Sequence, residues 1–348
     1  ILNFLMKILK KSHYIEVERL NVKMNLDRGD REILFHLSLN ARATLNELAK
    51  KTRLSKEVVH YRMRRLEEQG VIQWYYAIIN AYRLGRVFYR MHVKTGSLPT
   101  EKEKEFIDYL SHHPHVTWVV ILDGEYNLLY TVWGKDTNDF QRVYYEIANR
   151  FVKYIQEQSF SIITTIYYFK HKFLVEKRDD TYQMTGGEIQ NPTLERIDQQ
   201  LLSLLSREGR LPLTGIARRL KTNPRTIHRR MKKLEQLGII TGYTTKINHS
   251  LLGFTQRKIM LTLNEPTQEA IAKLTEFIKK SFQTIYITLA IGKYDFEFEM
   301  MERSYADFHE LMQQLKDAFP GLVREYTSLI FYREPKVGQL EDNYAPRP

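Results

Sequence analysis

The chain contains a long internal repeat. Residues 26–70 align without a gap on residues 194–238, and 15 of these 45 positions are identical. The offset of 168 positions continues downstream, where Gly124-Glu-Tyr-Asn127 aligns with Gly292-Lys-Tyr-Asp295. This period is much longer than that of a solenoid repeat. We therefore expect two copies of one two-domain unit in a single chain.

Composition restricts what each copy can do. The 348 residues are 43% hydrophobic, which is enough for several folded cores. Lys and Arg number 53 against 41 Asp and Glu, so the net charge of +12 favours an anionic partner such as nucleic acid. The absence of cysteine excludes disulfides, cysteine-ligated zinc, iron–sulfur clusters and a thiol nucleophile.

No segment approaches the roughly 20 apolar residues that cross a bilayer, so we expect a cytoplasmic protein without membrane partners. The apolar, basic-ended segment 1–11 is interpreted as part of an N-terminal extension. A lipid anchor is the weaker alternative for this segment.

The first part of each copy has the pattern of three helices. In the first copy a helical stripe starts near residue 26, a second helix follows Thr44, and a third runs from Lys56 to Gln69 and ends at Gly70. Ser55 is expected to cap the third helix. In the second copy Asn223 is the expected cap, with Pro224 at the first helical position.

A β-rich run follows each terminal glycine, at residues 71–79 and 239–247. Each run is expected to form a two-stranded wing, so that three helices and a wing make a winged helix-turn-helix. The rest of each copy reads β-α-β-β-α-β, which is typical of a ferredoxin-like fold.

The predicted fold class is α+β, with two winged helix-turn-helix domains alternating with two ferredoxin-like (βαββαβ) domains. The expected boundaries are 1–23 for an N-terminal extension, 24–85 and 193–253 for the winged helix domains, 86–174 and 254–335 for the ferredoxin-like domains, 175–192 for a flexible linker and 336–348 for a C-terminal tail.

The chain resembles the Lrp/AsnC family of prokaryotic transcription regulators over nearly its whole length from Met24. The resemblance rests on the third helices, residues 55–72 and 223–240, each followed by a run ending in Leu-Gly. The later Gly-x-Tyr-Asn/Asp strands resemble the family's small-molecule-sensing RAM domain. The resemblance implies a sequence-specific DNA-binding regulator rather than an enzyme, with no cofactor.

A third helix in the major groove presents its first turns to base edges, while longer basic side chains contact phosphates. The residues expected to face bases are Lys56, His60, Tyr61, Arg225, His228 and Arg229, and those expected near phosphates are Arg62, Arg64, Arg65, Arg230, Lys232 and Lys233, with Arg218 and Arg219 as further candidates. Ser55 and Asn223 complete the predicted DNA-binding set. The alternative is that these charged residues only form the solvent-exposed face of an amphipathic helix.

By resemblance, RAM sheets pair across a dimer and bind an amino acid or a similar metabolite at the interface. The candidate effector residues are Gly124, Asn127, Gly292 and Asp295. Copy two carries an aspartate there that can accept from an ammonium group, whereas copy one carries an asparagine. The alternative is that these residues only shape a β-turn.

Three other interpretations fit the sequence less well. His112-His113-Pro-His115 lacks acidic or cysteine partners at ligand spacing, so no metal site is predicted. Siroheme decarboxylases resemble the same architecture and carry a strand similar to Tyr126-Asn127-Leu128, but here Asp123 and Gly124 precede that strand, where the enzymes are expected to have basic residues. A protein-joining scaffold leaves the basic helices unexplained.

The duplication allows two assemblies. The copies either pair within the chain as a pseudo-twofold unit, or each pairs with another chain. In the first case the different third helices favour unequal DNA half-sites over a palindrome.

Overall fold

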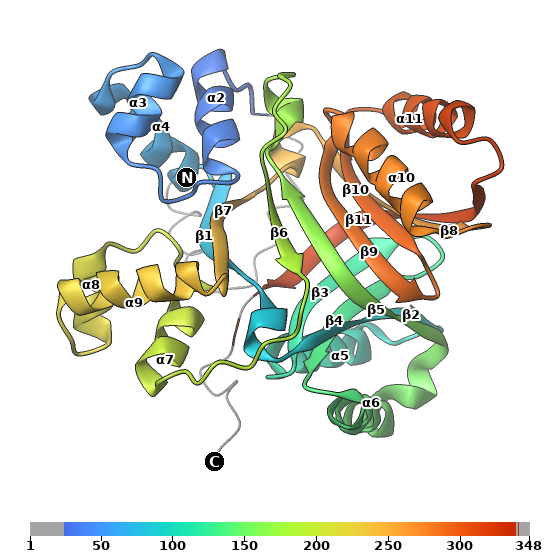
Figure 1. Cartoon of the computed structure of the whole chain (residues 1–348). Helices are drawn as coiled ribbons and strands as arrows, with labels where there is room; N and C mark the ends of the chain where they lie inside the picture. Colours follow the sequence, from blue (N-terminus) through green and yellow to red (C-terminus); the bar gives the residue numbers. More distant parts are fainter. Residues whose placement is uncertain (1–23, 339, 341–348) are drawn as a thin grey trace.

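The computed structural model describes residues 24–338 and 340. In Figure 1 two three-helix units lie on the left of the molecule, and a double layer of strands flanked by helices lies on the right. The N-terminal extension predicted for residues 1–23 lies outside the described residues.

The three-helix unit of copy one consists of α2 (Arg28–Leu37), α3 (Leu45–Thr52) and α4 (Lys56–Glu68). Each helix starts at a side-chain cap: the carboxylate of Asp27 accepts from Asp30 N, Thr44 from Glu47 N and Ser55 from Val58 N. These bonds satisfy amide groups that have no partner inside the helix. The cap predicted at Ser55 is confirmed.

The unit of copy two repeats this arrangement with α7 (Arg196–Leu205), α8 (Leu213–Arg219) and α9 (Pro224–Gln236). Asn223 caps α9 by accepting from Thr226 N at 2.8 Å, and Pro224 stands in its first turn. Both predictions are confirmed. The buried stripes of the two third helices also match, since Val59, Met63 and Leu66 occupy the positions of Ile227, Met231 and Leu234.

The expected two-stranded wing in each copy is wrong. Each copy supplies one strand, β1 (Ile72–Ile79) or β7 (Ile240–Ile247), and the two strands pair antiparallel with each other. Ile72 faces Ile247 and Ile79 faces Ile240, so the pairing obeys a pseudo-twofold axis that passes between Tyr76 and Thr244. We call this two-stranded sheet the ribbon. A short 3-10 helix follows each strand, η1 (Ala81–Leu84) or η4 (Ser250–Leu252).

Eight further strands form a closed ring of hydrogen-bonded pairs, in the order β2-β4-β3-β11-β8-β10-β9-β5, with β5 pairing again with β2. Their bounds are β2 (Val87–Thr95), β3 (Val116–Asp123), β4 (Leu128–Gly134), β5 (Ile155–Phe169), β8 (Thr255–Leu263), β9 (Thr284–Gly292), β10 (Phe296–Glu302) and β11 (Val323–Val337). The long strands β5 and β11 each leave their own copy and pair with the other copy, at β9 and β3. The two copies therefore pair within the chain.

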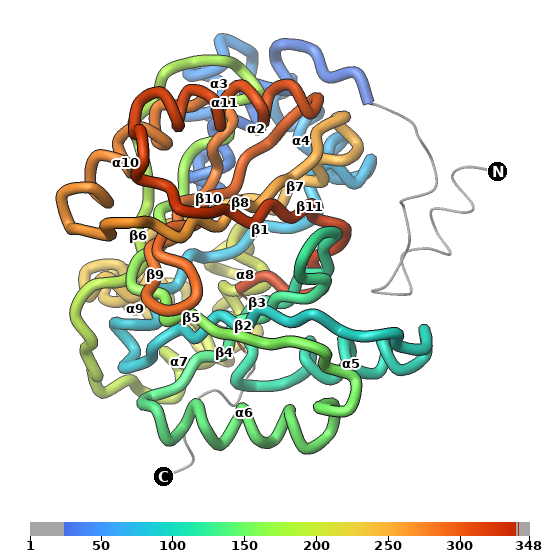
Figure 2. The backbone as a smooth tube through the Cα atoms, turned by 90° about the vertical axis from the view of Figure 1, so that its right-hand side faces the viewer, coloured from blue at the N-terminus to red at the C-terminus, as the bar shows by residue number. Residues whose placement is uncertain are grey.

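Four helices cover the outside of this ring: α5 (Thr100–His112), α6 (Thr137–Phe151), α10 (Gln268–Lys280) and α11 (Tyr305–Ala318). Figure 2 shows α5 and α6 on one side of the strands and α10 and α11 on the other. Two equivalent cores fill the space between helices and strands, one around Phe106 and Phe151 and one around Phe296 and Phe308. Each copy thus has the predicted βαββαβ order.

Two predicted boundaries need correction. Within residues 175–192, which were expected to be a flexible linker, β6 (Tyr182–Gly186) pairs with β5 and adds a strand beside the ring. The strand β11 continues to Val337, two residues into the predicted tail. Leu340 is held on α7, because its carbonyl accepts from the hydroxyl of Ser203 at 3.1 Å. Residues 339 and 341–348 lie outside the described part.

Candidate nucleic-acid interface

The predicted base-facing residues of both third helices are exposed. Lys56, His60 and Tyr61 lie on the open side of α4, and the Tyr61 side chain is 65% exposed. Arg225, His228 and Arg229 lie on the open side of α9. Neither face is covered by the ring, which lies on the other side of the molecule (Figure 1). The fold therefore leaves both helices accessible to a partner.

Three of the arginines predicted near phosphates are instead engaged inside the protein. Arg62 Nη1 lies 2.6 Å from Asp27 Oδ2 and 2.9 Å from Asp30 Oδ1, and Arg65 Nη2 lies 2.6 Å from Asp30 Oδ2. The hydrogen bond from Arg62 holds the pKa of Asp27 below its usual value. These contacts join the third helix to the first.

Copy two repeats the pairing. Arg230 Nη2 lies 2.6 Å from Glu195 Oε2, and Arg230 Nη1 lies 2.9 Å from Asp198 Oδ1. Hydrogen bonds to Glu195 and Asp198 raise the pKa of Arg230. Because Arg62 and Arg230 occupy equivalent positions with equivalent partners, their identity in the two copies reflects helix packing. Both arginines therefore have a structural role, and their contact with phosphates stays a prediction.

Five cations of the predicted set on α4 and α9 are exposed and form no ion pair with any residue of the described part of the chain: Lys56, Arg64, Arg225, Arg229 and Lys233. The same holds for the further candidate Arg218 on α8. Lys232 is also exposed but lies 3.1 Å from Glu235, and Arg219 pairs with Glu208. Surface pairs of this kind are weak and exchange readily for another anion. The five free cations are therefore the best candidates for phosphate and base contacts.

The two third helices differ in charge. In α9 five basic residues accompany one acidic residue, Glu235, whereas α4 has four basic and three acidic residues. Positions Glu57 and Tyr61 of α4 correspond to Arg225 and Arg229 of α9. The two helices therefore offer different donors to a bound nucleic acid.

Each third helix is tied to the ribbon by an equivalent pair of side chains. Tyr75 on β1 donates from its hydroxyl to Glu67 of α4 at 2.6 Å, and Tyr243 on β7 donates to Glu235 of α9 at 3.2 Å. This linkage was not predicted, although both pairs recur at the 168-residue offset. The ribbon is thus bonded to both third helices.

The four candidate effector residues have roles within the fold. The side chain of Asn127 accepts from Thr95 N at 2.9 Å, and that of Asp295 accepts from Leu263 N at 2.8 Å, so each terminates the equivalent neighbouring strand. Gly124 and Gly292 have φ of +142° and +136°, and a Cβ there would lie 2.7 Å from Leu329 Cδ2 and 2.8 Å from Phe160 O. These residues therefore have structural roles in the fold, and their contact with an effector stays a prediction.

Comparison with known proteins fits this arrangement. A family model described as winged helix-turn-helix DNA-binding matches residues 26–73 and 194–241. The HTH-type transcriptional regulator LrpA of Pyrococcus horikoshii is 32% identical over 130 residues, which are 37% of this chain and 87% of that relative. The chain belongs to the Lrp/AsnC family.

Two other relatives show how much of this chain one Lrp/AsnC protein covers. An uncharacterised HTH-type transcriptional regulator of Pyrococcus furiosus is 29% identical over 149 residues, which are 42% of this chain and 96% of the relative. The proline dehydrogenase transcriptional activator of Rhodobacter capsulatus is 30% identical over 119 residues, 34% of this chain and 77% of the relative. One relative therefore corresponds to about one of the two copies.

The two-copy fold itself is known in an enzyme. The crystal structure of the siroheme decarboxylase NirDL has a TM-score of 0.58 and 13% identity, covering 90% of this chain and 94% of that chain. At this identity the similarity shows the fold alone. In this Lrp/AsnC chain, no described helix is both long enough and apolar enough for a bilayer span.

Proposed function

We propose that this chain is a sequence-specific DNA-binding transcriptional regulator that acts in the cytoplasm and places α4 and α9 in the major groove of double-stranded DNA. Winged helix proteins use the third helix in this way, with its first turns at base edges. Family membership supports the proposal, since the relatives are named as HTH-type transcriptional regulators.

The observation that carries the proposal is the exposure of the two helices after the rest of the chain has folded. Five cations on α4 and α9 remain without an ion pair among the described residues. The polar faces of α4 and α9 are left open, although the chain has 41 acidic residues that could neutralise these cations. An unneutralised, outward cationic face is the electrostatic signature of a phosphate-binding surface.

The residues divide by position along the helix. Lys56, His60 and Tyr61 in α4, and Arg225, His228 and Arg229 in α9, lie in the first two turns and are assigned to base edges. Arg64 and Lys233 lie further along and are assigned to phosphates, with Lys232 joining them once Glu235 is displaced.

The ribbon fixes how the two helices are presented. Since β1 and β7 pair within the chain, α4 and α9 belong to one molecule and are related by the pseudo-twofold axis. One chain therefore supplies both halves of the dimer-like arrangement that symmetric DNA sites require.

Selection of bound fragments from a random DNA pool, followed by affinity measurements at increasing salt, tests the proposal. Enrichment of a defined sequence is expected, with log affinity falling by about 0.9 per phosphate contacted for each unit of log salt. A double variant, Arg229→Ala with Lys233→Ala, should lose most of this binding, whereas Lys273→Ala on α10 serves as an exposed lysine control. Absence of enrichment, or binding that is indifferent to salt, would overturn the proposal.

A siroheme decarboxylase activity is the alternative, favoured by the fold match over 90% of the chain. Asp123 and Gly124 weaken it, because an acidic residue precedes the strand at which basic residues would hold a tetrapyrrole carboxylate. Titration with siroheme separates the two functions. A saturable absorption change with loss of carboxylate, together with no retarded DNA, would replace the regulator by the enzyme.

A further inference from the structure

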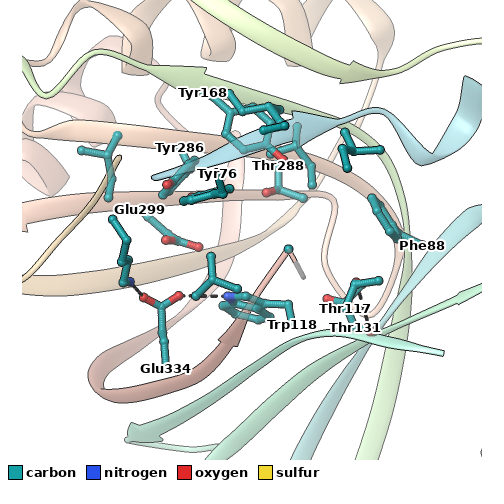
Figure 3. Close-up of a pocket in the computed structure, with 18 of the residues that line it drawn as sticks. Tyr76, Phe88, Thr117, Trp118, Thr131, Tyr168, Tyr286, Thr288, Glu299 and Glu334 are labelled. Atoms are coloured by element: carbon teal, nitrogen blue, oxygen red, sulfur yellow. Dashed lines mark hydrogen bonds and ion pairs between the residues drawn. The ribbon is translucent and has the colours of Figure 1, made fainter. Parts of the chain in front are cut away.

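A cavity of about 130 Å³ lies where the ribbon crosses one end of the strand ring. Every strand of the ring and both strands of the ribbon contribute lining residues. Figure 3 shows Tyr76 of the ribbon beside Tyr286 and Thr288 of copy two, with Trp118 and Thr131 of copy one across the opening. The cavity therefore lies at the junction of all four domains.

Several aromatic side chains stand in the walls. Tyr76, Phe88, Trp118, Tyr168 and Tyr286 line the space. The volume is close to that of a well-studied engineered cavity of about 150 Å³ that stays dry and binds benzene. A single planar ring is therefore a size class that fits this space.

The charges along the walls compensate one another. Lys246 pairs with Glu334, which also accepts from Trp118 Nε1 at 2.9 Å. The lining residue Glu299 pairs with Lys258, whose Nζ lies 3.2 Å from Glu299 Oε1 and 2.7 Å from Glu297 Oε2; neither Lys258 nor Glu297 lines the cavity itself. Because each of these buried carboxylates already has a cation, a net charge on a ligand would stay unpaired at this depth and is disfavoured.

The Arg90 guanidinium completes the compensation on the other wall. Its Nη1 lies 3.1 Å from Glu297 Oε2, and its Cζ lies 4.4 Å from the centre of the Trp118 ring. The ring face of Trp118 is thus already occupied on one side by this cation. A ligand entering the cavity meets aromatic surface and neutral ion pairs instead of a free charge.

Two histidines that line the cavity have ring nitrogens without a hydrogen-bond partner among the described residues. Nδ1 of His171 and Nε2 of His249 are buried and have no hydrogen-bond partner among the described residues, and the two rings lie 5.2 Å apart. Burial lowers the pKa of both imidazoles, so both are neutral near pH 7. A neutral imidazole nitrogen without a partner suits a hydroxyl or amide group.

We propose that this cavity is a binding site for an uncharged, ring-sized aromatic molecule that carries a hydroxyl or amide group, and that its occupancy adjusts the DNA-binding helices. This link to DNA rests on the proposed function, whereas the site itself does not. A ligand under the ribbon contacts Tyr76, next to Tyr75, and Tyr75 is bonded to Glu67 of α4. The same path reaches α9 through Tyr243 and Glu235.

Tryptophan fluorescence offers a direct test on the full chain. Two of the three tryptophans, Trp118 and Trp133, line the cavity. Phenol is expected to change the emission saturably. Tyramine and 4-hydroxybenzoate carry opposite charges, and each is expected to bind at least about tenfold more weakly than phenol, which is the equivalent of one lost favourable contact. Equal binding of all three probes, or no saturable change with any, would overturn the site; the second result would mean a cavity that holds only water.

Cavity-filling variants control for non-specific binding. Thr288→Phe should weaken phenol binding at least about tenfold. Thr288→Val, which keeps the shape of the side chain but not its hydroxyl, should keep binding within a few-fold. Thr117→Leu fills the space from the opposite wall and replaces Thr288→Phe if that variant does not fold. Unchanged binding in a folded filling variant would contradict the assignment.

The effect of the ligand on DNA binding is measured separately, with a DNA fragment enriched from the random pool. Saturating phenol should change DNA affinity by about fivefold or more, the lower end of typical coupling between sites, and Thr288→Phe should abolish the change. Phenol binding without any effect on DNA affinity would overturn the coupling. If the chain bound no DNA at all, the proposed function would fail, whereas the fluorescence titration would still decide the site.

Discussion

Arg42 and Arg210 hold the two copies together in the same way from opposite sides. Arg42 Nη1 donates to Gly209 O at 2.7 Å, and Arg210 Nη1 donates to Ala41 O. Each guanidinium also lies over a ribbon tyrosine of the other copy, Arg42 over Tyr243 at 5.4 Å and Arg210 over Tyr75 at 5.7 Å. The two arginines therefore form a reciprocal clamp about the pseudo-twofold axis.

Removing either arm of this clamp should destabilise the whole chain. Arg42→Ala and Arg210→Ala are each expected to lower the free energy of unfolding by about 1.5–3 kcal/mol, the range for hydrogen bonds from charged groups. Urea denaturation measures this loss. Arg64→Ala, an exposed arginine with no ion pair among the described residues, is the matched control and should stay within about 0.5 kcal/mol of wild type. Equal effects at all three positions would refute the clamp.

Arg229 and Lys233 should affect DNA binding differently. Arg229→Ala is expected to relax sequence preference because it removes a base-edge donor, at a cost of about 1–3 kcal/mol on the preferred site. Lys233→Ala should weaken all DNAs alike and reduce the salt slope by about one unit. Competition binding with preferred and scrambled duplexes distinguishes these results. Identical behaviour of the two variants would show that the assignment along α9 is wrong.

Arg230 is adjacent to Arg229 but should act on stability. Arg230→Ala leaves the buried Asp198 carboxylate without its cation, which is expected to cost about 1–3 kcal/mol of unfolding free energy. Calorimetric melting of Arg229→Ala and Arg230→Ala compares the neighbours directly. A large loss of DNA affinity in Arg230→Ala with unchanged melting would return this residue to the DNA interface.

The two half-sites in DNA should differ in sequence. Footprinting of the wild-type chain is expected to show unequal halves, because α9 presents Arg225 and Arg229 where α4 presents Glu57 and Tyr61. The double variant Arg225→Glu with Arg229→Tyr gives α9 the residues of α4 at these positions. Its selected site should become more palindromic. A perfect palindrome selected by the wild-type chain would contradict the expectation.

Acid should destabilise the protein through one half-buried and one buried histidine. Burial lowers the pKa of His36 to about 4 and that of His171 to about 3, whereas an unfolded imidazole titrates near 6.5. Below about pH 6.5 the unfolded chain therefore binds protons that the folded chain does not. The free energy of unfolding should be independent of these groups above that pH and fall as the pH drops toward 4.

From pH 7 to pH 5 the expected loss is about 1–2 kcal/mol for each of these histidines. Urea denaturation at both values measures it. His171→Gln should show a smaller pH dependence than wild type, because one of the buried imidazoles is gone. His112→Gln is the control, since His112 is exposed. An unchanged pH dependence in His171→Gln would contradict the account.

Local signals predicted the helices and their caps well. Ser55 and Asn223 cap their helices as expected because a cap needs only a side-chain oxygen and an amide three residues away. The βαββαβ order followed in the same way from alternating patterns along the chain. These features depend on neighbours in sequence.

The features that sequence reasoning missed depend on partners far along the chain. The pattern of residues 71–79 identifies a strand, but its partner β7 lies about one repeat away, so the wing was assigned locally and wrongly. The arginines Arg62 and Arg230 carry the same charge whether they face DNA or the acidic start of the first helix. A usable signal was present, because both acidic partners recur at the 168-residue offset.

The closed ring of strands has a consequence for dosage. A regulator assembled from separate subunits dissociates on dilution, and each subunit then carries only one DNA-binding helix. Its occupancy of a DNA site depends on the square of the protomer concentration while subunits are scarce. Here one chain carries both third helices, so a chain that acts alone should occupy an operator in simple proportion to the number of chains. The fusion also lets the third helix of one copy accumulate substitutions without altering that of the other copy.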